Sequence, residues 1–425
     1  MQDDFLQDLI SQGLTAQISD AEKLGDHLVG GMRTLYCGFD PTADSLHIGN
    51  LVPLLGLRRF QLAGHRPIVL IGGATGLIGD PSFKAEERSL IDSDVVAGWV
   101  EKIKLQVSPF VSFEDTENSA ILVNNLDWTE NLDVISFLRD IGKHFSVNAM
   151  IQKESVRSRL TTSNEGLSYR EFSYMILQSM DYMELAKRYG CSLQIGGSDQ
   201  WGNITSGMDL VRRTVGSEAF ALTLPLVTKA DGTKFGKTES GTIWLDGNKT
   251  SPYTYYQFWL NSADADVSHY LRIFTFMDKE QFAALDESLV NEPQKRTAQK
   301  ALAREQTLLV HGEAGLASAQ RISDALFGGK GGGNALTETD LEQLQLDGMD
   351  SVVIEASDLL GVLAGSPLAQ SRGAARRLLE SGGIKINGER VDVADVQLLK
   401  SAALFGKYHL IQRGKKHWCL AVHKS

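Results

Sequence analysis

The stretch from residue 34 to residue 50, TLYCGFDPTADSLHIGN, limits the possible folds more than any other part of the chain. Residues 34–39 are rich in β-formers, and Pro41 then disfavours a helical conformation for the residue before it. Apolar residues recur at helical spacing over 48–60, which predicts a helix. We therefore expect a strand, a turn and the start of a helix in immediate succession.

The polar residues of this turn predict an anion site. Ser45 is a candidate N-cap for the predicted helix, so His47 and Asn50 should lie in its first turn. Free N–H groups and the helix dipole favour a negative charge at that position. The turn is therefore a candidate phosphate site.

The same alternation of strand and helix continues along the chain. Further strands are predicted at 66–71 and 120–124, with helices before and after the second of them. Strand, helix and strand in this order predict right-handed crossovers and a parallel sheet, whose ligands bind beyond the carboxyl ends of the strands. A further strand is predicted in LQIGGSDQWGN. The polar residues that follow these three strands along the chain are Asp80, Asn125, Asp199 and Gln200.

A long helix is predicted over 169–190, YREFSYMILQSMDYMELAKRYG. One of its faces is apolar, and a second carries Tyr174, Gln178 and Asp181 at helical spacing. Taken alone, such a polar stripe is usually a solvated face. It becomes a candidate binding surface only if the helix borders the sheet edge described above.

Two loops carry the charges that a polyphosphate would require. One is the polar stretch after residue 82, and the other is KFGKT at 234–238, which follows an Ala-Asp-Gly turn. Exposed charges are usually only solvated, but two lysines and a hydroxyl on a glycine-containing loop suit a phosphate ligand. The candidate residues are Lys84, Arg88, Lys234, Lys237 and Thr238.

The length of 425 residues predicts two or three domains, and 42% hydrophobic with 22% charged residues is typical of a globular protein. The net charge of -11 argues against a uniformly nucleic-acid-coating protein. The charge is uneven, however, because residues 355–425 carry 11 Lys and Arg against 6 Asp and Glu. The glycine-rich segment 328–334 predicts a flexible linker before this basic end.

The segment beyond this linker is expected to form a small α+β module. It contains a basic helix at 371–380 and a hairpin at 384–391 with an Asn-Gly turn. Basic residues near Tyr408, His409 and Trp418 favour an RNA-binding face over a merely solubilising surface. The candidate RNA-binding residues are Arg372, Arg376, Arg377, Lys407, Arg413, Lys415 and Lys416.

Cysteine usage and hydropathy narrow the expected environment. Cys37, Cys191 and Cys419 are far apart and form no CxxC pair, so neither a disulfide framework nor a metal site is expected. The acidic, amphipathic N-terminus is unlike a secretory signal, and no apolar run is long enough to span a bilayer. We expect a cytoplasmic protein without a membrane partner.

Several motifs together resemble a known family. HIGN at 47–50 and KFGKT at 234–238 resemble the HIGH and KMSKS motifs of class I aminoacyl-tRNA synthetases. The segments YCGFDPTADSLH, GGATGLIGDPS, EFSYMILQSMD and LQIGGSDQWGNI are similar to those of bacterial tyrosyl-tRNA synthetases in particular. The resemblance covers nearly the whole chain. Its one departure is Asn50, which stands where the motif has a second histidine.

The resemblance implies an α/β fold with a Rossmann-type parallel-sheet catalytic domain and a helical insert, followed by a helical domain and a small α+β RNA-binding domain. It implies the boundaries 1–246 for the catalytic domain, 247–327 for a helical tRNA-side domain and 335–425 for the RNA-binding domain. A homodimer is implied as well, with the insert near 130–190 at its interface.

The implied reaction joins tyrosine to tRNA(Tyr) through a tyrosyl-adenylate, with ATP as substrate, Mg²⁺ accompanying the ATP and no dedicated metal site. The resemblance assigns Thr42, His47, Lys84, Arg88, Lys234, Lys237 and Thr238 to catalysis at the phosphates. It assigns Asp40, His47, Gly49, Asn50, Asn125, Asp199, Lys234 and Lys237 to ATP. For tyrosine it implies Tyr36, Asp80, Tyr174, Gln178, Asp181 and Gln200, with Gln194 as a further neighbour.

Three alternatives stay open at this point. A tryptophanyl synthetase is disfavoured because Tyr36 and Asp181 suit a phenol better than an indole, which offers only a donor. Small nucleotidyltransferases share the first motif but have no reason to carry a basic tail. A non-catalytic RNA-binding paralogue is disfavoured by the presence of His47, Lys234 and Lys237.

Overall fold

The structure is a computed structural model of the whole chain, and it describes residues 5–82, 92–162, 166–233, 235–238, 241–328, 335–355, 358–392 and 396–424. Two compact units are present. Unit 1 consists of residues 1–246 and 263–298, and unit 2 consists of residues 247–262 and 299–425. Residues 263–298 therefore group with the sheet, whereas the expected division had placed them in a helical domain at 247–327. The division into three domains stays a prediction.

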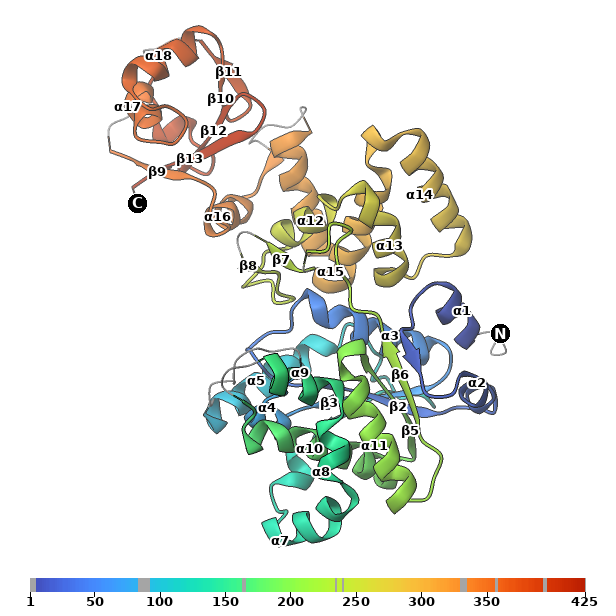
Figure 1. Cartoon of the computed structure of the whole chain (residues 1–425). Helices are drawn as coiled ribbons and strands as arrows, with labels where there is room; N and C mark the ends of the chain where they lie inside the picture. The colour runs from blue at the N-terminus through green and yellow to red at the C-terminus, as the bar shows by residue number, and fades with distance from the viewer. Residues whose placement is uncertain are drawn as a thin grey trace. The chain divides into compact units, whose positions relative to one another are not determined.

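Unit 1 is built on a six-stranded sheet of order β1-β6-β5-β2-β3-β4, seen in the lower half of Figure 1. All neighbouring strands are parallel except β1, which pairs antiparallel with β6. The strands are β1 (Gln17–Ile18), β2 (Thr34–Phe39), β3 (Arg66–Ile71), β4 (Ile121–Asn124), β5 (Cys191–Gly197) and β6 (Phe220–Leu224). The parallel α/β sheet expected from the sequence is confirmed.

Helices cover both faces of this sheet. Because crossovers are right-handed, the helices between β2, β3 and β4 lie on one face, and those that lead to β5 and β6 lie on the other. The helices up to β4 are α1 (Phe5–Ser11), α2 (Ala21–Val29), η1 (Ile48–Asn50), α3 (Leu51–Leu62), α4 (Thr75–Ile78) and α5 (Ser93–Val107). Those of the insert and beyond are α6 (Leu126–Thr129), α7 (Val134–Ser136), η2 (Phe137–Ile141), η3 (Gly142–His144), α8 (Val147–Ile151), α9 (Glu154–Thr162), α10 (Tyr169–Tyr189), η4 (Ser198–Gln200) and α11 (Trp201–Thr214).

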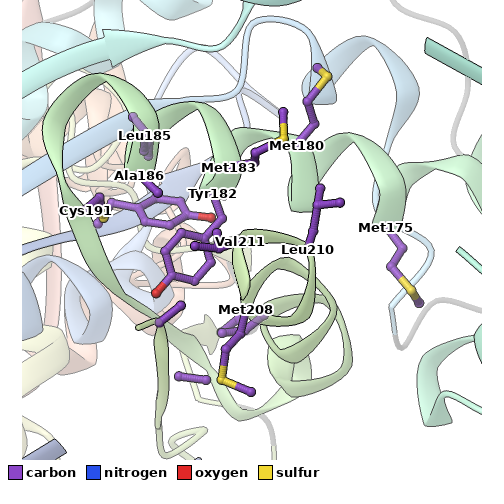
Figure 2. Close-up of a cluster of buried hydrophobic side chains, with 14 of the residues drawn as sticks. Met175, Met180, Tyr182, Met183, Leu185, Ala186, Cys191, Met208, Leu210 and Val211 are labelled. Carbon is purple, nitrogen blue, oxygen red and sulfur yellow. The ribbon is translucent and has the colours of Figure 1, made fainter. Parts of the chain in front are cut away.

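The packing of α10 against α11 forms a large part of the core of unit 1. Buried methionines and aliphatic side chains from both helices meet in this cluster, and Figure 2 shows Met175, Met180, Tyr182, Met208 and Leu210 among them. Helix α10 begins at the N-cap Ser168 and ends at Gly190 in the left-handed conformation. The core therefore fixes the helix that carries the polar stripe.

The rest of unit 1 includes a short hairpin, which begins within the KFGKT segment, and three helices that follow it. The hairpin pairs β7 (Lys237–Thr238) with β8 (Gly241–Thr242), and the helices are α13 (Asp264–Phe274), α14 (Lys279–Asn291) and η5 (Pro293–Lys295). Arg272 on α13 pairs with Asp286 on α14 at 2.6 Å. This pair joins the two helices.

Unit 2 contains two helices followed by a small α+β module. The module has a five-stranded sheet of order β11-β10-β12-β13-β9, in which β9 and β13 are parallel. The two helices are α12 (Pro252–Leu260) and α15 (Thr297–Phe327). The elements that follow are α16 (Glu338–Leu346), β9 (Ser351–Ile354), α17 (Leu359–Ala364), α18 (Arg372–Glu380), β10 (Ile384–Ile386), β11 (Glu389–Val391), η7 (Lys400–Ala402), β12 (Tyr408–Arg413) and β13 (His417–His423). The predicted hairpin at 384–391 is confirmed, with Asn387 and Gly388 both at positive φ.

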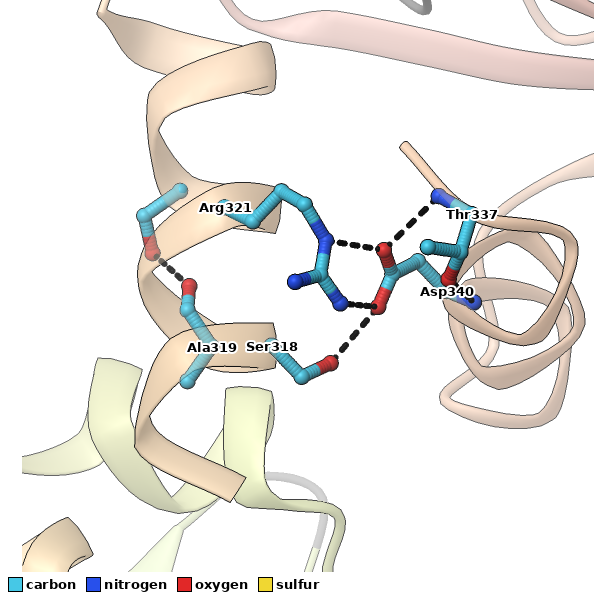
Figure 3. Close-up of polar contacts among 6 residues, drawn as sticks. Ser318, Ala319, Arg321, Thr337 and Asp340 are labelled. Atoms are coloured by element: carbon cyan, nitrogen blue, oxygen red, sulfur yellow. Dashed lines mark hydrogen bonds and ion pairs between the residues drawn. The ribbon is translucent and has the colours of Figure 1, made fainter. Parts of the chain in front are cut away.

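A partly buried ion pair joins α15 to α16 (Figure 3). The carboxylate of Asp340 accepts hydrogen bonds from Nε and Nη2 of Arg321 at 2.6 and 2.9 Å. It also accepts from the Ser318 hydroxyl at 2.6 Å and from the Thr337 backbone N–H at 2.9 Å. Both sides of the predicted linker 328–334 are therefore held together, although residues 329–334 lie outside the described residues.

Candidate active site

A cavity of about 360 Å³ lies at the carboxyl ends of β2 and β5. These two strands are neighbours at the point where the chain order of the sheet reverses, which is where open α/β sheets bind ligands. The cavity brings together predicted site residues that are far apart in the sequence of unit 1. These are Tyr36, Asp40, Thr42, His47, Asn50, Asp80, Tyr174, Gln178, Asp181, Asp199 and Gln200.

Asp181 is the most deeply placed charge in the cavity wall, with 2% of its surface exposed. Its carboxylate accepts hydrogen bonds from Asn125 Nδ2 at 3.0 Å and from Trp128 Nε1 at 2.9 Å. Burial raises the pKa of this carboxyl to about 7, and the two neutral donors only partly oppose that rise. Each carboxylate oxygen keeps a further lone pair for a ligand.

Tyr36 faces the same cavity from β2 and is almost fully buried. Burial and the charge of Asp181 raise the pKa of its phenol well above the usual value. Its hydroxyl has no hydrogen-bond partner among the described residues, and the same is true of Gln178 Oε1 and Gln194 Oε1 in the cavity wall. Buried polar atoms normally have partners, so these three atoms indicate a polar ligand.

The polar stripe of α10 faces the cavity rather than solvent. The usual interpretation of such a stripe, a solvated face, is therefore wrong for this helix. Tyr174 and Asp181 are buried, and all three residues of the stripe line the cavity. The Tyr174 hydroxyl donates to Asp40 Oδ2 at 2.7 Å, while the Thr75 hydroxyl donates to Asp40 Oδ1 at 2.6 Å. The long helix and the turn after β2 are thereby joined.

The HIGN turn differs in detail from the expectation. His47, not Ser45, is the N-cap: its side chain accepts from the Gly49 N–H at 3.0 Å, while the Asn50 Oδ1 accepts from the His47 N–H at 3.0 Å. Ser45 is unsuited to capping because its hydroxyl bonds Leu46 O and Gln106 Oε1. The expectation for Ser45 is therefore wrong, and the amide of Asn50 completes the capping box.

Hydrogen bonds also join the cavity residues that follow β3 and β5. Gln200 Nε2 donates to Asp80 Oδ2 at 2.6 Å, and Asp80 Oδ1 accepts from the Ser82 N–H at 2.9 Å. Burial raises the pKa of the neighbouring Asp199 carboxyl. Asp80 and Asp199 therefore add two carboxyl groups to those of Asp40 and Asp181 in the cavity wall, which suits a cationic group such as an ammonium.

Some predicted residues are not brought into the cavity wall. Gly49 lies in the turn but does not line the cavity, and Asn125 is fully buried behind Asp181. The Asn125 amide accepts from the Ala74 N–H and donates to Thr75 and Asp181. Lys84, Arg88 and Lys234, together with the side chains of Lys237 and Thr238, lie outside the described residues.

Trp128 is a site residue to which the sequence assigned no role. It follows β4 and reaches Asp181 across 53 positions in the chain, while the guanidinium of Arg188 lies 5.3 Å from the centre of its ring. Trp128 lies on the short helix α6, and no local pattern marks its indole N–H as the donor to Asp181, so this role could be found only from the fold. Gln194, expected only as a neighbour, lines the cavity.

The predicted RNA-binding residues of unit 2 fall into two groups. Arg372 pairs with Asp358 at 2.9 Å, Lys407 approaches Glu342 at 3.4 Å, and Arg413 donates to Leu368 O at 2.7 Å. The other group is exposed to solvent and consists of Arg376, Arg377, Lys415 and Lys416.

No group of three or more His, Cys, Asp or Glu side chains that could hold a metal ion occurs within the described ranges. Among those same residues, no helix combines the length and the apolar character that a membrane crossing requires.

Comparison with known proteins identifies the family. Residues 31–328 match the family model of class I tRNA synthetases for W and Y, and residues 340–421 match the C-terminal domain of SYY-like tyrosine–tRNA ligases. The tyrosine–tRNA ligase of Aliivibrio fischeri strain MJ11 is 59% identical over 99% of both chains. That of Cronobacter sakazakii is 54% identical, over 99% of this chain and 98% of the other.

Solved structures agree with this assignment. A C-terminally truncated mitochondrial tyrosyl-tRNA synthetase from Aspergillus nidulans superposes with a TM-score of 0.68 at 29% identity, covering 76% of this chain and 94% of its own. The tryptophanyl-tRNA synthetase of Plasmodium falciparum shares only the fold, with a TM-score of 0.52 at 13% identity over 80% of this chain and 90% of its own. The chain therefore belongs to the tyrosine–tRNA ligases, within the class I family of tRNA synthetases.

Proposed function

We propose that this chain activates L-tyrosine with ATP and then transfers the tyrosyl group to the 3′-terminal ribose of tRNA(Tyr). The observation that carries the proposal is the buried Tyr36 hydroxyl without a partner, in the same cavity wall as the Asp181 carboxylate. A phenol can satisfy both groups at once, because it accepts from Tyr36 and donates to Asp181. An indole cannot, because its N–H only donates.

The same two groups account for selectivity against phenylalanine. Phenylalanine would fill the cavity but would leave the Tyr36 hydroxyl and Asp181 without partners, at a cost of about 1–3 kcal/mol for each group. Asp80, Tyr174, Gln178 and Gln200 would surround the ammonium and carboxylate of tyrosine. A polar penalty, rather than shape, would thus exclude the smaller substrate.

Activation would proceed by attack of the tyrosine carboxylate on the α-phosphorus of ATP, with pyrophosphate as the leaving group. The carboxylate is already ionised at neutral pH, so the reaction needs no general base. Catalysis then consists of positioning and of stabilising charge on the departing pyrophosphate. The groups proposed for this role are Thr42, His47, Lys84, Arg88, Lys234, Lys237 and Thr238.

ATP would lie along the turn after β2 and the end of β5. Asp40, Gly49, Asn50 and Asp199 would contact its ribose and adenine, whereas the engaged amide of Asn125 supports an indirect role through Asp181. Mg²⁺ would accompany the phosphates of ATP. The exposed basic residues of unit 2 would contact tRNA through its phosphates.

A homodimer is also proposed, through the insert near residues 130–190. Large apolar side chains of this insert are exposed to an unusual degree, including Val134 at 69% and Ile135 at 68%. Ile135→Asp should therefore shift the molar mass measured by light scattering from a dimer to a monomer. A variant that remains dimeric would contradict this interface.

The activity is tested by ATP–pyrophosphate exchange with each of the twenty amino acids. Tyrosine alone should give a signal, and charging of tRNA(Tyr) should follow in a second assay. Exchange with tryptophan, or no exchange with any amino acid, would refute the proposal.

The role of the KFGKT loop has a separate test. Lys234→Ala should lower kcat for adenylate formation more than it raises KM for tyrosine, because the lysine would act on the departing phosphates. A normal kcat together with weak tyrosine binding would refute that role.

A further inference from the structure

One face of α13 contacts Ala230, which precedes the KFGKT segment, and Phe235 within it. Asp266 Oδ1 accepts a hydrogen bond from the Ala230 N–H at 2.7 Å. Phe235 stacks on Phe274, with ring centres 5.3 Å apart and planes 18° apart, and meets Tyr270 edge-on at 5.2 Å. The three α13 residues follow one another at intervals of four, so they lie on the same face of the helix.

The same loop is attached on its other side to the HIGN turn. Gly236 O accepts from the Ile243 N–H at 3.3 Å, and Ile243 O accepts from the Ile48 N–H at 2.9 Å. A Cβ on Gly236 would lie 2.4 Å from Ile48 Cγ2, and its φ of +78° also requires glycine. Phe235 and Gly236 therefore connect α13 directly to the turn that begins α3.

Helix α13 is itself fixed to α3 by an independent contact. Arg59 Nη2 on α3 donates to the carbonyls of Arg272, Ile273 and Thr275 at the C-terminal end of α13, at 3.1, 2.8 and 3.0 Å. A cation at this end also interacts favourably with the helix dipole. The KFGKT segment and the helix that follows the HIGN turn are therefore both attached to α13.

We infer that Asp266, Tyr270 and Phe274 are positioning residues that place the KFGKT loop for the activation step, with Phe235 as the side chain through which they act. This inference rests on the proposed function. Phe235 directly follows Lys234 in the chain, so a displaced ring displaces the backbone beside that lysine. Misplacement of a catalytic group by about 1 Å can cost about a hundredfold in rate, whereas the tyrosine cavity is lined by other elements.

The test compares Phe235→Ala, Phe274→Leu and the double variant. Phe235→Ala should lower kcat for tyrosine-dependent exchange about tenfold, which corresponds to about 1.4 kcal/mol. Phe274→Leu should lower it about threefold, and it should have no further effect when Phe235 is already alanine. The Kd for tyrosine, measured by equilibrium titration, should stay within about twofold in all three variants.

A second pair of variants, at Asp266, tests the positioning role without removing an apolar side chain from the core. Asp266→Ala should lower kcat and increase amide hydrogen exchange in peptides from 229–245, whereas Asp266→Asn, which retains an acceptor for the Ala230 N–H, should restore both. Asp286→Asn, which breaks the pair with Arg272 on the opposite side of α13, is the matched control and should leave kcat unchanged.

Normal kcat in Phe235→Ala, additive losses in the double variant, or equal losses in the control Asp286→Asn would each overturn the positioning role. These results require an active wild-type protein. Absence of tyrosine-dependent exchange in the wild type would instead refute the proposed function, so the two failures are distinguishable.

Discussion

Two buried aspartates, one in each unit, have the same exposure and opposite electrostatics. Asp181 in the candidate active site and Asp340 on α16 are both 2% exposed. Asp181 accepts hydrogen bonds only from the neutral groups of Asn125 and Trp128, and burial raises its pKa to about 7. For Asp340, burial also favours the neutral form, but the bonds from Arg321, Ser318 and Thr337 outweigh it and lower the pKa to about 2.

The difference shows how one residue type serves stability in one place and binding in another. A carboxylate with a guanidinium partner stabilises the folded state and offers little to a ligand. A carboxylate with neutral partners alone costs stability in the empty protein, and a phenol can supply the missing donor. The Tyr36 hydroxyl, which lines the same cavity as Asp181 and has no partner among the described residues, agrees with this account, because one phenol could bond both groups.

The largest effect is expected from removal of the active-site carboxylate. Asp181→Ala should lower the preference for tyrosine over phenylalanine, measured as the ratio of kcat/KM in pyrophosphate exchange, by about a hundredfold or more. The reason is that the phenol loses a charged acceptor, and hydrogen bonds to charged groups contribute about 1.5–3 kcal/mol. Unchanged selectivity would show that Asp181 does not contribute to the discrimination between tyrosine and phenylalanine.

A substitution of Asp340, the second of these two aspartates, should affect stability without affecting selectivity. Asp340→Asn loses the charge that Arg321 stabilises, and a pKa lowered from 3.8 to about 2 corresponds to about 2 kcal/mol. The transition of unit 2 in calorimetry should move to lower temperature, while tyrosine-dependent exchange at 25 °C stays normal. Because the folded pKa is depressed, this contribution is present above pH 3.8 and disappears as the pH falls through about 2. An unchanged transition would contradict the assignment.

A smaller effect is expected from the residue that holds Asp181. Trp128→Phe removes one neutral donor and keeps an aromatic ring, so kcat/KM for tyrosine should fall about tenfold, or about 1.4 kcal/mol. Tyr182→Phe is a suitable control, because its hydroxyl bonds Phe220 O instead of Asp181. Equal losses in both variants would indicate general repacking of the core rather than orientation of the carboxylate.

Local signals in the sequence predicted much of the fold. Pro41 marked the end of β2, the Asn387-Gly388 pair marked the hairpin, and alternation of strands and helices predicted the parallel sheet. These signals act over a few residues and are therefore readable from the chain. The assignment of Ser45 as a cap failed because its hydroxyl is used by Gln106, a partner 61 positions away.

The site was less accessible from the sequence for the same reason. The spacing of Tyr174, Gln178 and Asp181 predicts one helix face, but only the tertiary structure shows that this face borders the cavity. Trp128 and Asn125 reach Asp181 across more than fifty positions. The motif resemblance identified many residues of the cavity, whereas their mutual hydrogen bonds required the fold.

The most direct test of the contrast is the pH dependence of thermal unfolding for the free wild-type protein and Asp181→Asn between pH 5 and pH 8, with Asp340→Asn as control. A carboxyl with a folded pKa of about 7 and an unfolded value of 3.8 binds more protons when folded, so its stabilising contribution is full below pH 3.8 and is lost as the pH rises through 7. The wild type should therefore lose stability relative to Asp181→Asn by up to about 1.4 kcal/mol per pH unit between pH 5 and 7. The difference between the wild type and Asp340→Asn should stay constant over this range. Parallel curves for the wild type and Asp181→Asn would contradict the account, because they would mean that Asp181 is already ionised and stabilised before tyrosine binds.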